Sequence, residues 1–339
     1  MKRFILTKLL GALAAVIGAS ILAFILMRII PGDPARLQLG PAATDEALRG
    51  LRREMGLDQP MWKQYWIYMT DFIQGDWGRS FKFGQRVFPL MRSRFAASVE
   101  LGITAFVLAF VGATAAAVLT TYRRNKPLEK VANGTAHIGL GTPPFWIGLI
   151  LLLLVSQKLG IFPGPGRLDA EVAAPNKITG FYTIDFLLAG DIRGFLDAVH
   201  HLVLPAITLG LAPGAFLYRL FRANLLDVAD SPFLLVARMK GVGRLRAFVR
   251  HAVPNAFLPT LTASGLLFGQ MLGGSVLIEE LFNWPGVGAA VTSGIRTQDF
   301  SVVQAFILIS ALMYVVISAL IDVLYGVIDP RLRGQGSGR

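Results

Sequence analysis

The chain has 339 residues, of which 54% are hydrophobic and 16% are charged, and its mean hydropathy is +0.56. Ordinary soluble domains carry about 25% charged residues, so this composition excludes a typical soluble protein and indicates a membrane protein. The net charge of +12 does not call for nucleic acid as a partner, because basic residues at the ends of membrane spans give the same excess. The chain has no cysteine, which excludes disulfides and thiolate metal sites.

Six apolar runs contain no Asp, Glu, Lys or Arg. Each is close to or above the ~20 residues that a helix needs to cross the hydrocarbon, and backbone groups in lipid must pair within their own segment. We therefore predict an all-α polytopic membrane protein with six transmembrane helices. The runs are Leu9–Met27, Leu101–Tyr122, Val131–Gln157, His201–Tyr218, Ala252–Ile278 and Phe300–Ile321.

Lys and Arg residues cluster at alternate ends of these runs. They precede the first run, separate the second from the third and the fourth from the fifth, and follow the sixth. Loops with this bias face the cytoplasm, so both termini are predicted to be cytoplasmic. The first run is longer than the core of a signal peptide and is not followed by a small-residue cleavage pattern, so we expect a retained helix.

Two longer segments are expected on the external side. In the first, apolar and aromatic residues repeat with helical spacing from Pro60 to Ile73, which predicts a helix that lies in the membrane interface or packs on its own subunit. The second, residues 156–200, is rich in Pro and Gly and is expected to form an ordered cap. No metal site is predicted at His200 and His201, because adjacent residues face different sides of a helix and no carboxylate stands at a suitable spacing.

A double proline interrupts the third apolar run. Pro143 and Pro144 remove two helical donors and predict a kink or break. Irregular backbone at membrane depth occurs where protein or a cavity covers it. Residues 142–146, including Phe145, are therefore expected beside a translocation path or a partner helix.

The fifth run contains a glycine repeat. Gly265, Gly269 and Gly273 recur every four residues. Small residues at this spacing let two helices approach closely in lipid. We expect a helix–helix seam there, either within the subunit or against a second one.

Two adjacent carboxylates, Glu279 and Glu280, follow the fifth run. Paired acids can act as general acid and base, but no other catalytic group accompanies them, so a structural or solute-contacting role at the mouth of the span is expected. No nucleotide-binding glycine loop or catalytic constellation occurs elsewhere, and the chain is predicted not to be an enzyme. The runs also lack the ionisable groups that ion-coupled carriers keep at membrane depth, so energy is expected from outside this chain.

The basic stretch 230–259 lies between the fourth and fifth runs, on the predicted cytoplasmic side. Ser231-Pro232 is a typical helix start and Gly241 a typical stop, which predicts a short helix over Phe233–Lys240 and a second over Arg244–His251. A short, partly apolar helix suits insertion into a groove of a partner protein. The alternative is a helix that binds anionic lipid through its arginines.

The sequence Ala237-Arg238-Met239-Lys240-Gly241, followed by His251 and Pro254-Asn255, resembles the EAA loop of ABC importer permeases of the dipeptide/oligopeptide/nickel branch. Leu235 and Val236 depart from the general loop, which has glutamate and alanine there. Further motifs of the branch occur in order along the chain. They include Pro31-Gly32-Asp33-Pro34, Gly75-Asp76-Trp77-Gly78-Arg79-Ser80, His201-Leu-Val-Leu-Pro205, Phe282-Asn283-Trp284-Pro285-Gly286-Val287-Gly288 and Asp329-Pro330-Arg331.

The resemblance implies the type I ABC importer permease fold. It divides the chain into an N-terminal transmembrane helix with an external amphipathic segment, residues 1–97, and a permease core of five transmembrane helices, residues 98–333. The coupling loop then covers residues 223–255. Contacts with the ATPase are implied for Ala237, Arg238, Lys240, Gly241, His251, Pro254 and Asn255.

The resemblance also implies a multi-pass permease subunit in a bacterial inner membrane, the first of two. Its partners would be a second, similar permease, two cytoplasmic subunits that bind and hydrolyse ATP, an external binding protein and membrane lipid, with no nucleic acid and no cofactor on this chain. The solute expected is a di- or oligopeptide. The alternatives are nickel or another peptide-like solute on the same machinery, and a stand-alone channel or ion-coupled carrier.

Overall fold

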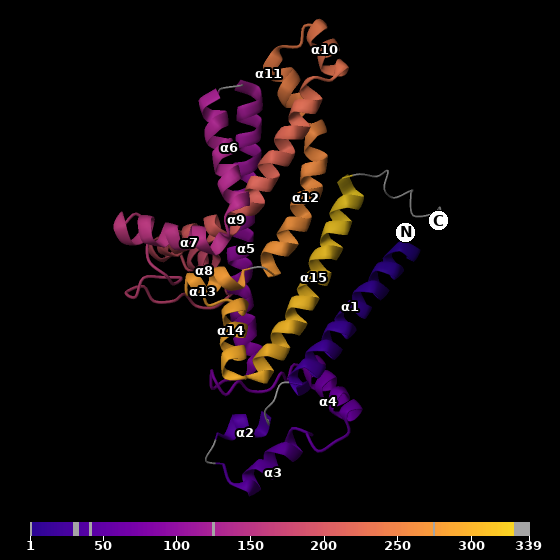
Figure 1. Ribbon diagram of the computed structural model, residues 1–339, viewed down its shortest axis with the longest axis vertical. Helices are drawn as coiled ribbons and strands as arrows, with labels where there is room; N and C mark the ends of the chain where they lie inside the picture. Colours follow the sequence, from indigo (N-terminus) through magenta and orange to yellow (C-terminus); the bar gives the residue numbers. More distant parts are fainter. Residues whose placement is uncertain (1, 30–33, 41–42, 124–125, 274, 329–339) are drawn as a thin grey trace. The chain divides into compact units, whose positions relative to one another are not determined.

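The computed structural model describes residues 2–29, 34–40, 43–123, 126–273 and 275–328. Over this part of the chain the fold is all-helical, without a β-strand and with one isolated bridge between Arg79 and Arg86 (Figure 1). The predicted motifs at Pro31-Gly32-Asp33 and Asp329-Pro330-Arg331 lie outside the described residues. The helices are α1 (Lys2–Ile29), α2 (Pro34–Leu39), α3 (Asp45–Glu54), α4 (Met61–Gln74), α5 (Val87–Arg123), α6 (Lys126–Gly141), α7 (Pro144–Leu151), η1 (Leu152–Lys158), α8 (Tyr182–Leu188), α9 (Ile192–Ala229), α10 (Pro232–Met239), α11 (Arg244–Ala247), η2 (Phe248–Ala252), α12 (Val253–Gly273), α13 (Val276–Leu281), α14 (Val287–Thr297) and α15 (Phe300–Ile328).

The chain forms two compact units. Unit 1 contains residues 1–96 and 286–339, and unit 2 contains residues 97–285. The long helix α5 therefore begins in unit 1 and continues through unit 2.

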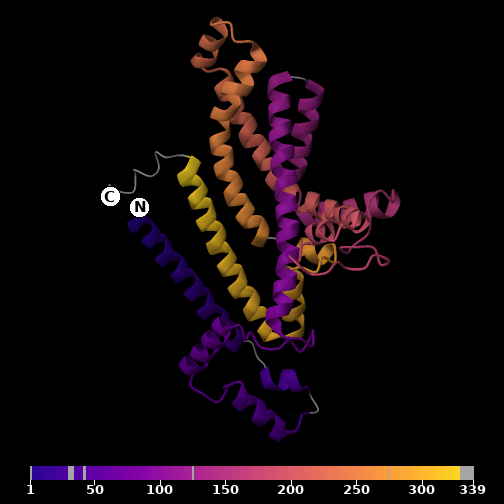
Figure 2. The same cartoon turned by 180° about the vertical axis from the view of Figure 1, so that it is seen from behind.

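Unit 1 pairs the two ends of the chain, because α1 and α15 lie side by side (Figures 1 and 2). Its apolar core joins the start of α5 to α14 and α15 through residues such as Val87, Met91 and Val302. A polar contact closes the same region, where the Ser80 hydroxyl donates to Asp299 Oδ2 over 2.5 Å. The motif that ends at Ser80 is thus fixed to the start of α15.

Helix α4 begins after Pro60, as the aromatic pattern predicts. One face packs on α1, where the hydroxyls of Tyr65 and Ser20 are 2.7 Å apart. The opposite face leaves Trp62 and Trp66 exposed at 72% and 68%. The two predictions for this helix, packing on its own subunit and lying in the membrane interface, are therefore compatible. One face packs on α1, and the other has the aromatic surface that suits a membrane interface.

In unit 2, α12 and α6 pack against α9, and α5 contributes to the same apolar core. The backbones of α5 and α9 approach closely, since a Cβ added to Gly210 would lie 2.7 Å from the Ala105 carbonyl oxygen. Helices α6 and α9 are almost as close, because a Cβ added to Gly139 would lie 3.0 Å from the Cβ of Ala215. Small residues thus bring three helices together, as expected for packing in lipid.

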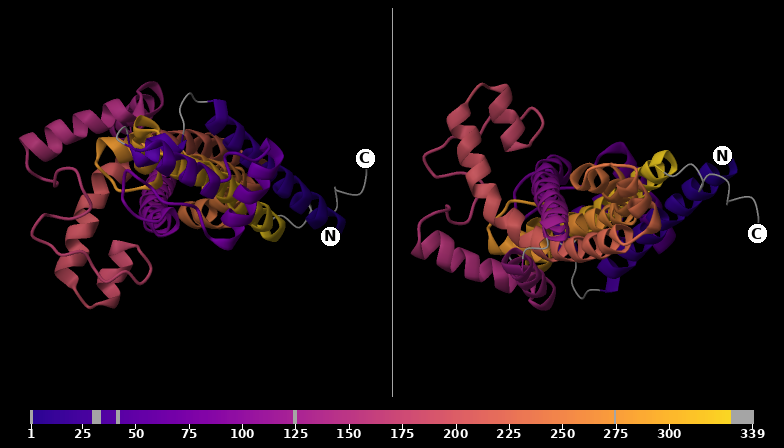
Figure 3. Two further views of the ribbon diagram at one scale, coloured as in Figure 1. Left: turned by 90° about the horizontal axis from the view of Figure 1, so that it is seen from below. Right: turned by 90° about the horizontal axis from the view of Figure 1, so that it is seen from above.

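The third apolar run is broken rather than straight. Helix α6 ends at Gly141, α7 starts at Pro144, and the axis bends by 117° between them. The break predicted at Pro143-Pro144 within Val131–Gln157 is confirmed. Both views of Figure 3 show α7 projecting sideways from the helices around α5 and α9.

Among the described helices, α5 and α9 are long and apolar enough to cross a membrane, and the bent pair that starts at α6 adds a third if it counts as one span. Shorter apolar helices cover Leu13–Leu26 and Phe300–Val316. The predicted limits of two runs are too narrow, because α5 and α9 extend well beyond Leu101–Tyr122 and His201–Tyr218. The count of six spans stays a prediction.

The α5–α9 contact gives a test of the fold. We expect Gly210→Val to destabilise the protein by about 1–3 kcal/mol, because the new side chain would overlap the backbone of α5. Gly112→Val on α5 is the matched control, since a Cβ there meets nothing within 4 Å. Thermal unfolding in detergent should show a lower midpoint for Gly210→Val alone, and equal midpoints would contradict the close packing of α5 and α9.

Candidate functional site

The segment between α9 and α12 folds nearly as its sequence predicts. The first expected helix, Phe233–Lys240, is observed as α10 (Pro232–Met239), and the second begins at Arg244 as α11 and continues through η2 into α12. Ser231 does not act as predicted, because its hydroxyl donates back to the Val228 carbonyl over 2.5 Å. Figures 1 and 2 show α10 and α11 at one tip of unit 2, far from α7 and α8.

Gly241 ends α10 in a left-handed conformation. Its φ is +81°, a region that non-glycine residues enter at a cost. The Val242 N–H then donates to the Ala237 carbonyl over 3.2 Å, which is the long hydrogen bond of a Schellman motif. Gly241 therefore terminates α10, and its position four residues after Ala237 determines where the chain turns.

Helix α10 presents an apolar surface that nothing in its own unit covers. Met239 is 71% exposed and Leu235 60% exposed, and Phe233 and Val236 are also exposed. Leu234, on the opposite side, is 1% exposed and belongs to the core of unit 2. One side of the helix is therefore anchored while the other offers apolar side chains to a partner.

The anchor extends through the following helix. Phe248 is 5% exposed and lies against Tyr122 at the end of α5, with ring centroids 5.4 Å apart. Arg244 donates from Nη2 to the Tyr122 carbonyl over 3.3 Å. Residues of α10 and η2 thus share one apolar core with the ends of α5 and α9.

The other predicted coupling residues sit around this turn. Lys240 and Pro254 are exposed, and His251 is half-buried. The exposed Asn255 donates from Nδ2 to the His251 carbonyl over 2.7 Å, which ties it into the first turns of α12. Arg238 lies in α10. All seven residues lie between α10 and the first turn of α12.

The glycine repeat of α12 does not make the closest helix contact in unit 2. A Cβ on Gly273 would meet nothing within 4 Å, and Gly265 and Gly269 are half-buried. The close approach occurs at Gly210 instead. Gly273 therefore does not contact another helix of this subunit closely. A close contact between the repeat and a second subunit stays a prediction.

The break at Pro143 and Pro144 is exposed on one side and packed on the other. Phe145 and Trp146 are 44% and 53% exposed. Gly148, one turn later, is so tightly packed that a Cβ would lie 2.6 Å from Leu281 Cδ2. The break is therefore held in place while its aromatic residues point to the outside of unit 2.

The two predicted mouth carboxylates differ completely in environment. Glu279 is fully buried and accepts hydrogen bonds at Oε1 from Ser98 over 2.6 Å and from Ser275 over 2.7 Å. Glu280 is exposed. Trp284, which follows, is 1% exposed and donates from Nε1 to the Ala97 carbonyl over 2.9 Å. Glu279 thus has a structural role in joining α13 to α5, and only Glu280 remains accessible to a solute.

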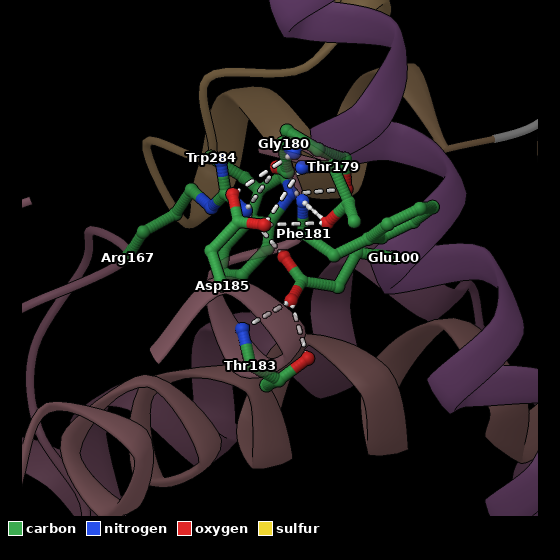
Figure 4. Close-up of polar contacts among 9 residues, drawn as sticks. Glu100, Arg167, Thr179, Gly180, Phe181, Thr183, Asp185 and Trp284 are labelled. Carbon is green, nitrogen blue, oxygen red and sulfur yellow. Dashed lines mark hydrogen bonds and ion pairs between the residues drawn. The ribbon is translucent and has the colours of Figure 1, made fainter. Parts of the chain in front are cut away.

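Sequence reasoning missed a buried ionic cluster on α5 (Figure 4). Glu100 is 4% exposed and pairs with Arg167, which is 8% exposed. Glu100 Oε1 also accepts from the N–H and hydroxyl of Thr183 over 2.9 and 2.7 Å. The guanidinium of Arg167 lies over the Tyr182 ring, 3.5 Å from its centroid. Glu100 directly precedes the second apolar run, so a search confined to the runs could not reveal it.

A second buried carboxylate organises the cap. Asp185 is 1% exposed. Burial raises its pKa, but hydrogen bonds from the hydroxyl and N–H of Thr179 and the N–H of Gly180, at 2.7 to 3.0 Å, outweigh burial and lower the pKa below the ordinary value. The predicted ordered cap is observed here, and it contains α8 and the first turns of α9.

Comparison with known proteins identifies the family. Residues 1–108 match the model of the N-terminal part of binding-protein-dependent transport system membrane components, and residues 109–334 match the binding-protein-dependent transport system inner membrane component. The chain belongs to this family of inner membrane components. Its function is therefore that of a membrane component of a transport system that works with a binding protein.

Relatives in this family match the chain over nearly its whole length. A probable D,D-dipeptide transport system permease protein of Escherichia coli (strain K12) is 37% identical over 97% of this chain and 96% of its own. A dipeptide transport system permease protein of the same organism is 37% identical over 98% and 99%. A glutathione transport system permease protein, also of Escherichia coli (strain K12), is 33% identical over 98% and 99%.

The buried ion pair predicts that removing one charge lowers the stability of the protein more than removing both. Arg167→Met should lower the stability by about 3–5 kcal/mol, because Glu100 would keep a buried charge without its partner. Adding Glu100→Gln should restore much of the loss, since no buried charge then remains. Thermal unfolding in detergent measures both, and a double variant less stable than Arg167→Met would contradict this account of the cluster.

Asp185 predicts a pH dependence. A lowered native pKa means that the carboxylate stabilises the fold above its ordinary pKa of 3.8, and that this contribution is lost as the pH falls through the lower native value. Asp185→Asn should therefore be less stable than the parent at pH 7, by about 1.5–3 kcal/mol for the loss of charged hydrogen bonds. The difference should shrink at pH 3, and a difference that grows on acidification would contradict the assignment.

Proposed function

We propose that this chain is the first of two permease subunits in an ATP-driven importer of di- or oligopeptides. The observation that carries the proposal is the exposed apolar surface of α10, which is anchored on the opposite side by the buried residue Leu234. A cytoplasmic ATPase would bind this surface. This chain binds no nucleotide, and the ATP is bound and hydrolysed by the partner subunits.

The proposed topology has six spans with both termini in the cytoplasm. It is supported by the alternation of basic residues along the chain and by helices at all six apolar runs. The tip with α10 and α11 then faces the cytoplasm, and the cap with α8 faces outward. We keep the division into residues 1–97 and a permease core of residues 98–333 as part of this proposal.

Motion of the ATPases would reach the membrane through the core that joins α10 to α5 and α9. Two ATPases that close on ATP and open after hydrolysis would swing the coupling loops of both permeases, which is rigid-body switching between two states. The absence of Asp, Glu, Lys and Arg within the six apolar runs supports an external energy source.

The second permease would pair with surfaces that this chain leaves open. Gly273 has free space around it on α12, and Phe145 and Trp146 are exposed beside the helix break. Small residues and aromatic edges of this kind suit close packing with a partner helix in lipid. Glu280 is exposed on α13, which follows the same helix, and lies at the proposed mouth of the span.

The solute class is proposed from the relatives. Their names specify dipeptides, D,D-dipeptides and glutathione, and glutathione is itself a tripeptide. An external binding protein would deliver the peptide to the pair of permeases.

Gly241 tests the coupling loop. Gly241→Asp should reduce peptide uptake at least ~10-fold without reducing the amount of protein in the membrane, because a side chain at φ +81° is strained and would shift the turn after α10. Gly241→Asn should retain more uptake than Gly241→Ala, since asparagine tolerates the left-handed region better. Uptake of a labelled dipeptide by cells that carry the complete transporter measures this series.

The matched control is Gly243→Asp. Gly243 has a φ of −57° at the start of α11 and open space for a Cβ, so aspartate there introduces the same charge without strain and is a good N-cap. Its uptake should equal that of the parent. Normal uptake by Gly241→Asp would contradict the role of the loop.

The solute and the energy source are tested in one vesicle assay. Vesicles with the complete transporter and binding protein should accumulate dipeptide only with ATP, and unlabelled dipeptides should compete while nickel should not. Competition by nickel would instead indicate that the same kind of transporter carries nickel. If vesicles with this chain but without the ATPases accumulate dipeptide, the chain is a stand-alone channel or carrier and the proposal is wrong.

A further inference from the structure

Three potential metal ligands meet at the edge of the cap. One side-chain donor atom each from Asp169, Asp197 and His201 lies within 4.8 Å of the others. Asp169 and Asp197 line a surface cavity of about 500 Å³ together with Glu171 and Arg193, and His201 is buried behind them. All of these residues belong to unit 2.

The three ligands are positioned by different means. Asp197 and His201 are one turn apart on α9 and therefore share a face of that helix. Asp169 comes from the cap loop, and its N–H donates to Asp197 Oδ2 over 3.0 Å. Two residues earlier in the same loop, Arg167 makes the buried ion pair with Glu100. The loop is thus fixed at the point from which Asp169 reaches toward α9.

His201 has its ring orientation set by the helix. Its Nδ1 lies 3.0 Å from the Asp197 carbonyl oxygen, and because a carbonyl can only accept, Nδ1 carries the proton. The Nε2 atom of a neutral ring then has a lone pair, and it faces Asp169 Oδ1 at 3.5 Å. A ring nitrogen that donates to a carbonyl holds a histidine in the orientation that metal-binding histidines adopt. Asp197 Oδ1 lies 3.5 Å from Nδ1, so this carboxylate has to turn toward Nε2 to share an ion with it, within the 4.8 Å that encloses the three ligand atoms.

The distance between Nε2 and Asp169 is within the range of an ion pair and also fits two ligands of one metal ion. Charged N–H···O⁻ hydrogen bonds measure about 2.7–2.9 Å, so the 3.5 Å between Nε2 and Asp169 is too long for one. Two ligands at about 2.0–2.2 Å from a tetrahedral zinc ion are roughly 3.3 Å apart, close to the observed separation. The side chain of Asp169 is 65% exposed, so it can move the small distance that remains.

We propose that Asp169, Asp197 and His201 form a binding site for a first-row divalent cation such as Zn²⁺, which clips the cap loop to α9. One imidazole nitrogen and two carboxylate oxygens suit such an ion, and solvent in the cavity would supply a fourth ligand. The charges that face the site are the carboxylate of Glu171 and the guanidinium of Arg193, both on the cavity wall, so the surroundings stay negative overall and attract a cation.

The neighbouring histidine is not part of the site. His200 Nε2 lies 2.9 Å from the Ile161 carbonyl oxygen, and its ring packs against Phe162. The prediction that excluded a metal here noted correctly that the two histidines face different directions. Its second premise was wrong, because Asp197 precedes His201 by one helical turn.

Direct titration tests the site. The full-length protein, purified with an affinity tag that contains no histidine, should bind one Zn²⁺ in the low micromolar range or tighter, as measured by calorimetry and by metal analysis. Asp169→Asn and His201→Gln should weaken binding at least ~10-fold, since even outer-shell partners of a metal site change affinity by about 10–100-fold. His200→Gln is the matched control and should bind like the parent, because the His200 ring points to the Ile161 carbonyl.

A spectroscopic variant keeps the test independent of stability. Because the chain has no cysteine, Asp169→Cys introduces a single thiol on an exposed loop. With Co²⁺ it should give a thiolate-to-metal charge-transfer band that disappears when His201→Gln is added, whereas Glu171→Cys should give none. The proposal is overturned if the parent binds no Zn²⁺ in this range, if all variants bind equally, or if Asp169→Cys gives no band.

Discussion

The buried ion pair between Arg167 and Glu100 is the constraint on which the cap of unit 2 depends. Two opposite charges inside an apolar surrounding must stay together, because separating them would leave each without compensation. Since Glu100 also accepts from Thr183 and Arg167 lies over Tyr182, the pair fixes the cap loop, α8 and α5 to one another. The exposed groups of the cap, including Asp169, take their positions from it.

The opposite tip of unit 2 follows a different principle. There the chain relies on apolar packing and on one left-handed glycine, with Leu234 and Phe248 in the core and Gly241 at the turn. Its outer surface, at Leu235 and Met239, stays apolar and exposed. Unit 2 thus combines a cap held by buried charges with a tip held by apolar packing, and the proposed contact with an ATPase uses that exposed surface.

The sequence predicted the elements that depend on local chemistry. The helix break at Pro143-Pro144, the start of α4 after Pro60 and the helix stop at Gly241 follow from the conformational limits of proline and glycine. It did not reveal Glu100 with Arg167, because that pair joins distant parts of the chain. The close contact at Gly210 was not predicted either, and the seam at the α12 glycines stays a prediction, since periodicity shows that a helix can approach another closely but not which partner it meets.

The docking role of α10 is tested most directly by cross-linking from a single cysteine. The chain has none of its own, so Met239→Cys places one thiol on the exposed surface, and Ile178→Cys places a control on the cap loop, where the side chain is 61% exposed against 71% for Met239. In membranes with the complete transporter, a short thiol-reactive cross-linker should join position 239 to an ATPase subunit and position 178 to none. If position 239 forms no cross-link to an ATPase and is instead labelled from the lipid phase, α10 is a lipid-binding helix and the coupling account is wrong.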